Sequence, residues 1–323
     1  MKSHIEVKAF AKINIGLEIQ KPLQDGYHPI LGIFNSVGIS DSLNFSRSDG
    51  RGIQVEGTFD CPPRATTVYR AAELFFERFD LHDKVIISVE KGIPVMAGLG
   101  GGSADAAATL LALDQLYGTN LETIELYSLA AKIGADVSFF LHGGAAIVSG
   151  RGDIIEAIRP RTDFGILLLY PGFGISTKWA YAALDSFREE RTKRQRPEER
   201  LVSWKEPVSE DVWLDPATAK MKLASRFARG VETWDFTNSF SPMLHAAFPV
   251  YPLLEAMMKE AGACFVSITG SGSCLYGVFR TMTEACEAEE KLNGLALRQN
   301  ATKTLYGMAL HAMKPLETSL LLG

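Results

Sequence analysis

A run of glycines followed by a serine is the part of this sequence whose residue types point most directly to chemistry. Residues 98–103 read GLGGGS and lead into the Ala- and Leu-rich segment Ala104–Leu116. Glycine lets the backbone adopt positive φ and approach a ligand closely. The first N–H groups of a helix lack helical acceptors and lie at the positive end of its dipole. The pattern predicts a helix beginning at Ala104, with Ser103 as its N-cap, and an anion site suited to phosphate.

Two known phosphate-binding patterns can be compared with this glycine loop. A P-loop requires a lysine immediately before its closing Ser or Thr, whereas Ser103 and Ala104 follow the last glycine here. A dinucleotide fingerprint has glycine where this chain has Ser103 and lies in the first strand-to-helix turn. About ninety residues of mostly strand-like pattern precede this loop, so the dinucleotide interpretation is the weaker one.

Two charged residues lie where charge is unusual. Lys12 is flanked by Ala11 and Ile13 in an otherwise apolar strand pattern, and lysine is rarely buried without a partner. Asp136 lies within the segment GADVSFF. Without further context, Lys12 is also consistent with a solvated edge-strand lysine, and Asp136 with a turn or helix-terminal aspartate.

A longer motif surrounds the glycine run. The pattern P-x-x-x-G-L-G-G-G-S-[SA]-[ND]-A-A is matched from Pro94 to Ala107. Together with the strand FAKINI (10–15) and a second glycine loop, TGSGS (269–273), it resembles the GHMP kinase superfamily. DGYH (25–28) and GADVSFF (134–140) are similar to the subfamily that phosphorylates 4-diphosphocytidyl-2-C-methyl-D-erythritol in the non-mevalonate isoprenoid pathway. The resemblance covers nearly the whole chain, except for about residues 187–210.

The resemblance implies an α+β, two-lobed GHMP kinase fold. Its N-terminal lobe would be like ribosomal protein S5 domain 2, and its C-terminal lobe ferredoxin-like. It implies transfer of a phosphoryl group from ATP to the substrate 2-hydroxyl, with Asp136 as general base and Lys12 as its partner. Mg²⁺ would arrive with ATP rather than occupy a resident metal site. The implied ATP-binding residues are Pro94, Val95, Met96, Ala97, Gly98, Leu99, Gly100, Gly101, Gly102, Ser103 and Ala104.

The resemblance also implies a site for a small molecule that carries a cytidine diphosphate group. Tyr27 and His28 resemble its cytosine-recognition pair, although His28 is also consistent with a turn histidine that caps local backbone. Tyr181 resembles the second stacking aromatic, with Phe173 and Trp179 as alternatives. Asn14 would face the methylerythritol portion. The second glycine loop would contribute Thr269 and Gly270.

Composition limits the class of partner and the compartment. The 323 residues include 33 basic and 38 acidic side chains, a formal net charge of −5, so no overall positive field attracts nucleic acid or anionic lipid. We predict neither as a partner. Cys61, Cys264, Cys274 and Cys286 form no C-x-x-C pair, and no long apolar run occurs. We therefore predict a cytoplasmic protein without disulfides, either a monomer or a homodimer.

Hydrophobic periodicity places these residues on elements. Alternating runs predict a mainly antiparallel sheet in the first sixty residues. Helical spacing is seen at residues 67–79, 126–133, 253–261 and 284–292, and strand-like runs at 85–89, 145–149, 165–170 and 265–269. The predicted domains are an N-terminal ATP-binding domain, 1–158, and a C-terminal domain, 159–323, with a charged insertion at about 187–210 that is solvated and either helical or mobile.

Two alternatives remain open at this stage. The chain could be a GHMP kinase for another alcohol, such as homoserine or mevalonate, although Tyr27 and His28 would then have no base to recognise. It could instead be a nucleotide-binding or regulatory protein that lost catalysis, although Lys12, Asp136 and both glycine loops are intact. Asn238-Ser239 departs from the subfamily, where an acidic residue often follows the asparagine, and this leaves the substrate fit in question.

Overall fold

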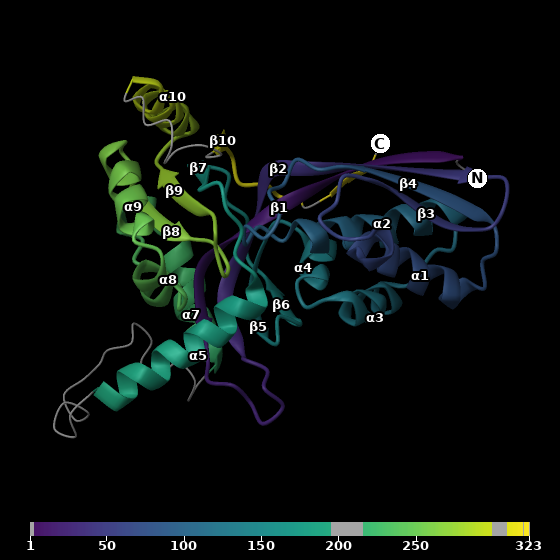
Figure 1. Cartoon of the computed structure of the whole chain (residues 1–323), viewed down its shortest axis with the longest axis horizontal. Coiled ribbons are helices and arrows are strands. Elements are labelled where there is room, and N and C mark those ends of the chain that lie inside the picture. Colours follow the sequence, from purple (N-terminus) through teal and green to yellow (C-terminus); the bar gives the residue numbers. More distant parts are fainter. Residues whose placement is uncertain (1–2, 195–215, 299–308, 319, 323) are drawn as a thin grey trace.

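The computed structural model describes residues 3–194, 216–298, 309–318 and 320–322. It contains two β-sheets, each covered by its own helices (Figure 1). We call the larger sheet with α1–α4 the first lobe, and the smaller sheet with its helices the second lobe. In Figure 1 the first lobe lies to the right and the second to the left, and the long strands β1 and β2 run between them.

The larger sheet has seven strands and is antiparallel except for one pair. Its order is β11-β1-β2-β4-β3, with β5 paired to β2 and β6 to β5, and only β3 and β4 run parallel. The strands are β1 (His4–Ile19), β2 (Ile30–Ser48), β3 (Gly52–Gly57), β4 (Lys84–Glu90), β5 (Ala145–Gly150), β6 (Ile154–Ala157) and β11 (Leu320–Leu322). The antiparallel sheet predicted for the first sixty residues is confirmed for β1 and β2.

Helices of the first lobe cover this sheet. They are α1 (Thr67–Phe79), α2 (Gly101–Tyr117), α3 (Thr123–Ile133) and α4 (Val137–His142), preceded by the 3₁₀ turn η1 (Pro63–Ala65). In α1 the buried residues recur at helical spacing, and the Tyr69 N–H donates to the Thr66 hydroxyl that caps the helix. In contrast, α2 is buried over most of its surface, and alanine and leucine make up much of its sequence.

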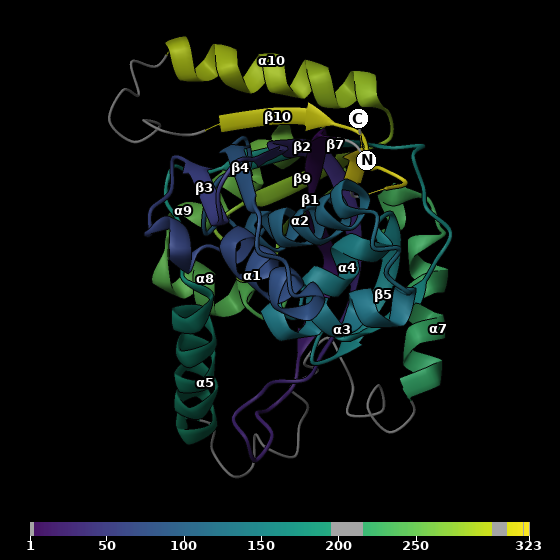
Figure 2. The ribbon, with the colours of Figure 1, turned by 90° about the vertical axis from the view of Figure 1, so that its right-hand side faces the viewer.

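The second lobe is built on a four-stranded antiparallel sheet of order β10-β7-β9-β8. Its strands are β7 (Gly165–Tyr170), β8 (Phe265–Ile268), β9 (Leu275–Phe279) and β10 (Ala309–Met313); its helical elements are α5 (Thr177–Arg194), α7 (Pro216–Phe227), η2 (Val231–Thr233), α8 (Ser241–Ala247), α9 (Val250–Glu260) and α10 (Met282–Arg298). Figure 2 shows α10 lying over β10, while α5 and α7 descend on opposite sides of the molecule.

Strand β1 contributes to both hydrophobic cores. Val7 and Ala9 pack in the core of the first lobe, and a register shift follows at Phe10/Ala11. Beyond this bulge Ala11, Ile13 and Ile15 pack in a second core with strands β7 and β9. The residues between them therefore point to the opposite face, toward α2 and the glycine loop.

The predicted domain boundary falls in the connection between β6 and β7. Strand β11, however, pairs with β1 in the larger sheet, so the end of the described chain contributes to the first lobe. The division at 158/159 stays a prediction. Residues 187–194 of the charged segment belong to α5, and the rest of that segment lies outside the described residues. In the part of the chain that the structure describes, no helix is long and apolar enough to cross a membrane.

Candidate active site

A cavity of about 470 Å³ lies where the two lobes meet. Residues from both glycine loops line it, together with the start of α1, Lys12 and Asn14 of β1, and Asp136 and Tyr181. Sequence segments more than a hundred residues apart therefore meet in one cleft.

Lys12 is the cationic centre of this cleft. The residue is only 4% exposed, and its Nζ donates to Asn14 Oδ1 at 2.7 Å and to the Gly98 carbonyl oxygen at 3.0 Å. The Asp136 Oδ2 lies 3.7 Å from the same nitrogen. Burial lowers the pKa of Lys12, and the neighbouring Asp136 carboxylate opposes part of that shift. The alternative of a solvated edge-strand lysine is wrong.

The carboxylate of Asp136 is accessible from the cleft. It occupies the N-cap position of α4 in an αR conformation, and its side chain makes no capping hydrogen bond. The side chain is 31% exposed and lines the cleft. A carboxylate held beside a buried ammonium group and open to the cleft can accept a proton from a bound hydroxyl group.

The first glycine loop needs its glycines at two positions in particular. Gly98 and Gly100 both have φ of +75°. A Cβ on Gly98 would lie 2.2 Å from the Thr269 carbonyl oxygen, and one on Gly100 would lie 2.7 Å from the Phe140 ring. Neither position admits a side chain without displacing its neighbour.

The prediction for the start of the following helix is wrong by three residues. Gly100, not Ser103, is the N-cap of α2, and the helix begins at Gly101. The N–H groups of Ser103 and Ala104 already donate to the Gly100 carbonyl oxygen. Because Gly100 adopts the left-handed conformation, the chain enters the helix earlier than a serine cap would allow. Ser103 thus lies in the first turn and lines the cleft.

The second glycine loop packs directly on the first. The Thr269 hydroxyl accepts the Asn14 N–H at 3.1 Å and lies 3.2 Å from the Gly98 carbonyl oxygen. The Cys274 N–H donates to the Ala97 carbonyl oxygen at 3.1 Å. Gly270 lines the cleft next to Asn14. These contacts hold Lys12, Asn14 and both loops as one rigid group.

The predicted cytosine-recognition residues lie near one another, and of the three only Tyr181 lines the cleft. The rings of His28 and Tyr181 are 5.0 Å apart between centroids. Tyr27 is 45% exposed, and the Arg151 guanidinium lies 5.0 Å from its ring centroid while pairing with Asp25.

The alternatives to Tyr181 pack elsewhere. Phe173 stacks on Phe248, and Trp179 lies edge-on to the same ring. Tyr181 lines the cleft, and Asp136 is near enough that its charge adds to the burial that raises the pKa of Tyr181. Of these three aromatic residues, Tyr181 is therefore the one that faces both His28 and Asp136.

Comparisons with known proteins agree with this geometry. Residues 66–144 match the family GHMP kinases N terminal domain, and residues 247–295 match GHMP kinases C terminal. A 4-diphosphocytidyl-2-C-methyl-D-erythritol kinase of Treponema pallidum (strain Nichols) is 35% identical over 289 residues, which is 89% of this chain and 94% of the relative. The chain belongs to the 4-diphosphocytidyl-2-C-methyl-D-erythritol kinase family. The predictions of this family, of kinase activity and of the α+β, two-lobed GHMP kinase fold are confirmed.

Other members of this family and the wider superfamily fit the same picture. A 4-diphosphocytidyl-2-C-methyl-D-erythritol kinase of Thermodesulfovibrio yellowstonii is 32% identical over 89% of this chain and 94% of its own. A crystal structure of 4-(cytidine 5'-diphospho)-2C-methyl-D-erythritol kinase has a TM-score of 0.70 at 28% identity, covering 96% of this chain and 99% of that one. A homoserine kinase from Cytophaga hutchinsonii has a TM-score of 0.73 at 18% identity, which shows a shared fold alone.

Sequence reasoning missed a buried charged cluster beside the glycine loop of this kinase. Lys91 Nζ lies 2.5 Å from Asp41 Oδ2 and 2.8 Å from Asp105 Oδ2. Asp41 Oδ1 also accepts the N–H groups of Gly92 and Ile93, where the chain enters the loop. The cluster therefore ties β2, the loop entry and α2 together. The sequence carries little signal for it, because Asp41 lies between two serines and Lys91 follows a glutamate, and only Asp105 is flanked by alanines.

The two carboxylates of this cluster share one cation. Burial alone would lower the pKa of Lys91, but the charges of Asp105 and Asp41 outweigh it and raise the pKa. Burial raises the pKa of Asp105 to about 7, against the opposing effect of Lys91. Oδ1 of Asp105 is buried without a hydrogen-bond partner among the described residues.

The departure from the subfamily at Asn238-Ser239 has a structural role. The Asn238 amide donates to the carbonyl oxygens of Ile268 and Gly270, both at 2.8 Å. The Ser239 hydroxyl accepts the Ile19 N–H at 3.0 Å, and the Ser239 N–H donates to the Leu17 carbonyl oxygen at 2.8 Å. This pair fixes the second glycine loop against the end of β1.

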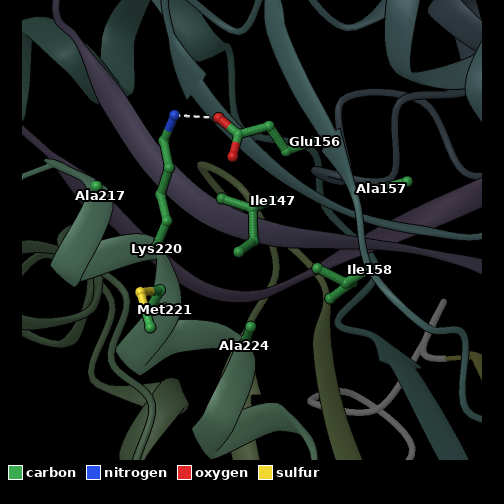
Figure 3. Close-up of a pocket in the computed structure, with 8 residues that line it drawn as sticks. All are labelled: Ile147, Glu156, Ala157, Ile158, Ala217, Lys220, Met221 and Ala224. Carbon is green, nitrogen blue, oxygen red and sulfur yellow. Dashed lines mark hydrogen bonds and ion pairs between the residues drawn. The ribbon is translucent and has the colours of Figure 1, made fainter.

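A larger hollow, of about 680 Å³, lies elsewhere (Figure 3). It lies between β5, β6 and α7, and the ion pair of Lys220 with Glu156 crosses it. None of the predicted site residues lines it.

The tripeptide Asp163-Phe164-Gly165 matches a protein-kinase metal signature but does not line the cleft. Asp163 is paired with Arg161, and Phe164 lies in the second core.

Proposed function

We propose that this chain transfers the γ-phosphoryl group of ATP to the 2-hydroxyl of 4-diphosphocytidyl-2-C-methyl-D-erythritol, giving ADP and the 2-phosphate. The observation that carries the proposal is the 3.7 Å pair of Lys12 and Asp136 within the cleft that both glycine loops line. The named relatives support the choice of substrate.

In the proposed reaction Asp136 accepts the proton of the 2-hydroxyl as its oxygen attacks the γ-phosphorus. The bond from that phosphorus to the β,γ-bridging oxygen breaks, and ADP leaves with the bond electrons. Lys12 supports the negative charge on the transferred group, and its own position is fixed by Asn14 and the Gly98 carbonyl oxygen. Asn14 orients the methylerythritol portion.

The triphosphate is proposed to lie on the segment Pro94–Ala104, where the start of α2 offers N–H groups to the phosphates. Gly270 lines the same cleft. The buried Thr269 holds the second glycine loop against Asn14 and Gly98. Among the described residues, no group of three acidic, histidine or cysteine side chains could cage a metal ion. Such a site suits Mg²⁺ that is carried by the phosphates, with the Ser103 hydroxyl as a protein ligand. Bound Mg²⁺ would neutralise phosphate charge.

Recognition of the cytosine base is assigned to Tyr27, His28 and Tyr181. The two tyrosines offer ring faces for stacking, and His28 offers a ring nitrogen for the base edge.

The cytoplasm is part of this proposal, because both ATP and a substrate of this kind are intracellular metabolites. All four cysteines are free.

The acceptor assay decides between this proposal and a kinase for another alcohol. ADP release is measured with purified protein, Mg²⁺ and ATP, and with the cytidine substrate, homoserine or mevalonate as the acceptor. We expect turnover of the cytidine substrate alone, with the 2-phosphate identified by ³¹P NMR. Turnover of homoserine or mevalonate without turnover of the cytidine substrate would refute the assignment. Nucleotide binding with no turnover of any acceptor would identify a family member without catalysis.

A further inference from the structure

A carboxylate outside the predicted site holds the ring of His28. The connection between β1 and β2 carries His28, and it lies beside α5 in Figure 1. The His28 Nε2 is 2.9 Å from Asp185 Oδ1 on α5. His28 is 8% exposed, so this contact joins two segments 157 residues apart at a buried ring.

The contact determines which ring nitrogen carries the proton. An ionised carboxylate can only accept hydrogen bonds, so the Nε2 that faces Asp185 must be the protonated nitrogen. In the neutral imidazole the other nitrogen, Nδ1, is then a lone-pair acceptor. Among the described residues, the structure gives the His28 side chain no other hydrogen bond. Nδ1 is therefore free to accept a hydrogen bond from a ligand.

Helix α5 presents this carboxylate and an aromatic ring to His28 together. Tyr181 and Asp185 are four residues apart, one helical turn, and lie on the same face. The Tyr181 ring contacts His28 at 5.0 Å and lines the cleft that contains Lys12 and Asp136. Tyr181 thus connects the pair of His28 and Asp185 to the cleft.

Pyrimidine bases differ in the group at C4, which is the group that an acceptor such as Nδ1 of His28 would bind. Cytosine carries an amino group at C4, which donates hydrogen bonds, whereas a uracil-type base carries a carbonyl oxygen there, which accepts. A histidine whose Nδ1 is fixed as an acceptor pairs with the first and repels the second. Resting on the function proposed above, we infer that Asp185 is a positioning residue that fixes the tautomer of His28 and thereby selects cytosine over uracil.

The substitution Asp185→Asn tests this inference. An asparagine amide keeps the shape of the side chain but can either donate or accept, so the ring is free to take the other tautomer and donate from Nδ1. Glu189→Gln, one turn further along α5 with its partner Lys193 in solvent, is the matched control. Both variants alter α5 by one charge, and thermal unfolding is expected to show both folded.

The readout is the ratio of affinities for cytidine diphosphate and uridine diphosphate, measured by calorimetry with the ATP site filled by a non-hydrolysable analogue. We expect the wild-type protein and Glu189→Gln to prefer the cytidine ligand. We expect Asp185→Asn to reduce that preference by about tenfold, the effect of one well-placed hydrogen bond. In ¹⁵N NMR spectra, the ring nitrogens of His28 should show the Nε2–H tautomer in the wild type and a mixture in Asp185→Asn.

Two results would overturn the inference. One is a wild-type protein that binds both diphosphates equally, and the other is an Asp185→Asn variant that weakens both to the same extent, which would make Asp185 a structural residue only. Failure of the proposed function is distinguishable from either, because loss of turnover with the cytidine substrate leaves this binding preference measurable.

Discussion

Lys12 illustrates how a single buried charge determines its surroundings. Its ammonium group has a counter-charge in Asp136 and two hydrogen-bond acceptors in Asn14 and Gly98. An isolated ammonium group in such a place would be strongly disfavoured. The cleft is therefore arranged around the requirements of one nitrogen atom, and the same nitrogen lies where the transferred phosphoryl group is proposed to pass.

Replacing the proposed general base tests the reaction at this scale. We expect Asp136→Asn to lower kcat by about a hundredfold or more, because the amide cannot take the proton of the acceptor hydroxyl. The KM for ATP should change little, since the carboxylate does not belong to the glycine loop. Steady-state assays with each substrate varied in turn measure both constants. An unchanged kcat would remove Asp136 from the mechanism.

The same substitution has a consequence for Lys12. Burial already lowers the pKa of Lys12, and the Asp136 charge opposes that shift. Without the carboxylate the pKa should fall further, so the neutral amine should predominate from a lower pH upward than in the wild type. Labelled Lys12 followed by NMR through a pH titration measures the change. A titration that is the same in both proteins would mean that the two side chains are not coupled.

Tyr27 can be tested with an aromatic control. We expect Tyr27→Ala to raise the KM for the cytidine substrate by about tenfold or more, because stacking on a base contributes about 1–3 kcal/mol. The KM for ATP should stay nearly constant. Trp179 is similarly exposed but packs on Phe248, away from His28, so Trp179→Ala should leave both constants nearly unchanged. Equal effects of Tyr27→Ala on both substrates would indicate a structural role.

Sequence reasoning found the residues whose type is unusual for their surroundings, and it missed those whose partners are distant. Lys12 stands out in an apolar strand, and the glycine run stands out by composition. Asp41 and Asp105, by contrast, form ion pairs with Lys91 only in the folded chain, so the sequence around each residue does not indicate the cluster. Asp185 was not singled out, because nothing local to it indicates the histidine 157 residues away.

At the scale of elements, local patterns predict most boundaries well. The ranges expected for α1 and β7 agree with the structure residue for residue, because each shows a clear hydrophobic period between turn residues. The start of α2 differed because Gly100, in the left-handed conformation, is its N-cap, and Gly101 and Gly102 belong to its first turn. Strands β10 and β11 were not predicted, since short edge strands depend on distant partners rather than on their own pattern.

The charged cluster beside α2 makes stability depend on pH. Burial raises the pKa of Asp105 to about 7 in the folded protein, above the usual aspartate value. The folded state therefore binds a proton more tightly than the unfolded state, and stability is lost as the pH rises toward 7. We expect Asp105→Asn to match the wild type near pH 4, to exceed it increasingly up to about pH 7 by at most about 1.4 kcal/mol per pH unit, and to keep a constant difference above that pH.

Urea denaturation at several pH values measures this difference. Glu73→Gln, which removes an exposed carboxylate paired with Arg70 on α1, is the control, and its stability relative to the wild type should change little with pH. A constant difference between Asp105→Asn and the wild type would show that Asp105 is ionised throughout this range.

At the scale of the whole molecule, the two lobes are joined through their glycine loops. Gly98 lies so near the Thr269 carbonyl oxygen that a Cβ on Gly98 would be 2.2 Å from it. We expect Gly98→Ala to destabilise the protein by several kcal/mol more than Gly118→Ala. Both glycines have positive φ, but a Cβ on Gly118 would meet nothing within 4 Å, so that variant should lose only the conformational cost of about 1–2 kcal/mol.

Chemical denaturation of both variants, together with the KM for ATP, tests whether this packing of the two glycine loops stabilises the protein. A Gly98→Ala protein as stable as Gly118→Ala would mean that the loops yield to an added methyl group without cost, and that the lobes are held together elsewhere.

The pairing of β1 with β2 has a consequence for how the molecule is made. These strands are consecutive and pair from His4 with Ser46 to Ile19 with Ile30, so residues 4–48 contain both partners of the longest ladder among the described strands. Closing this hairpin requires only the short connection at its end. Lys12 and Asn14 can thus acquire their native alignment before the glycine loop has been synthesised. In pulse-labelled refolding, the amide of Ile13, which pairs with Asn35 of β2, should be among the first to gain protection from hydrogen exchange. The amides of Lys12 and Asn14 donate to the Leu99 carbonyl oxygen and the Thr269 hydroxyl, so they should gain protection only when both glycine loops are in place.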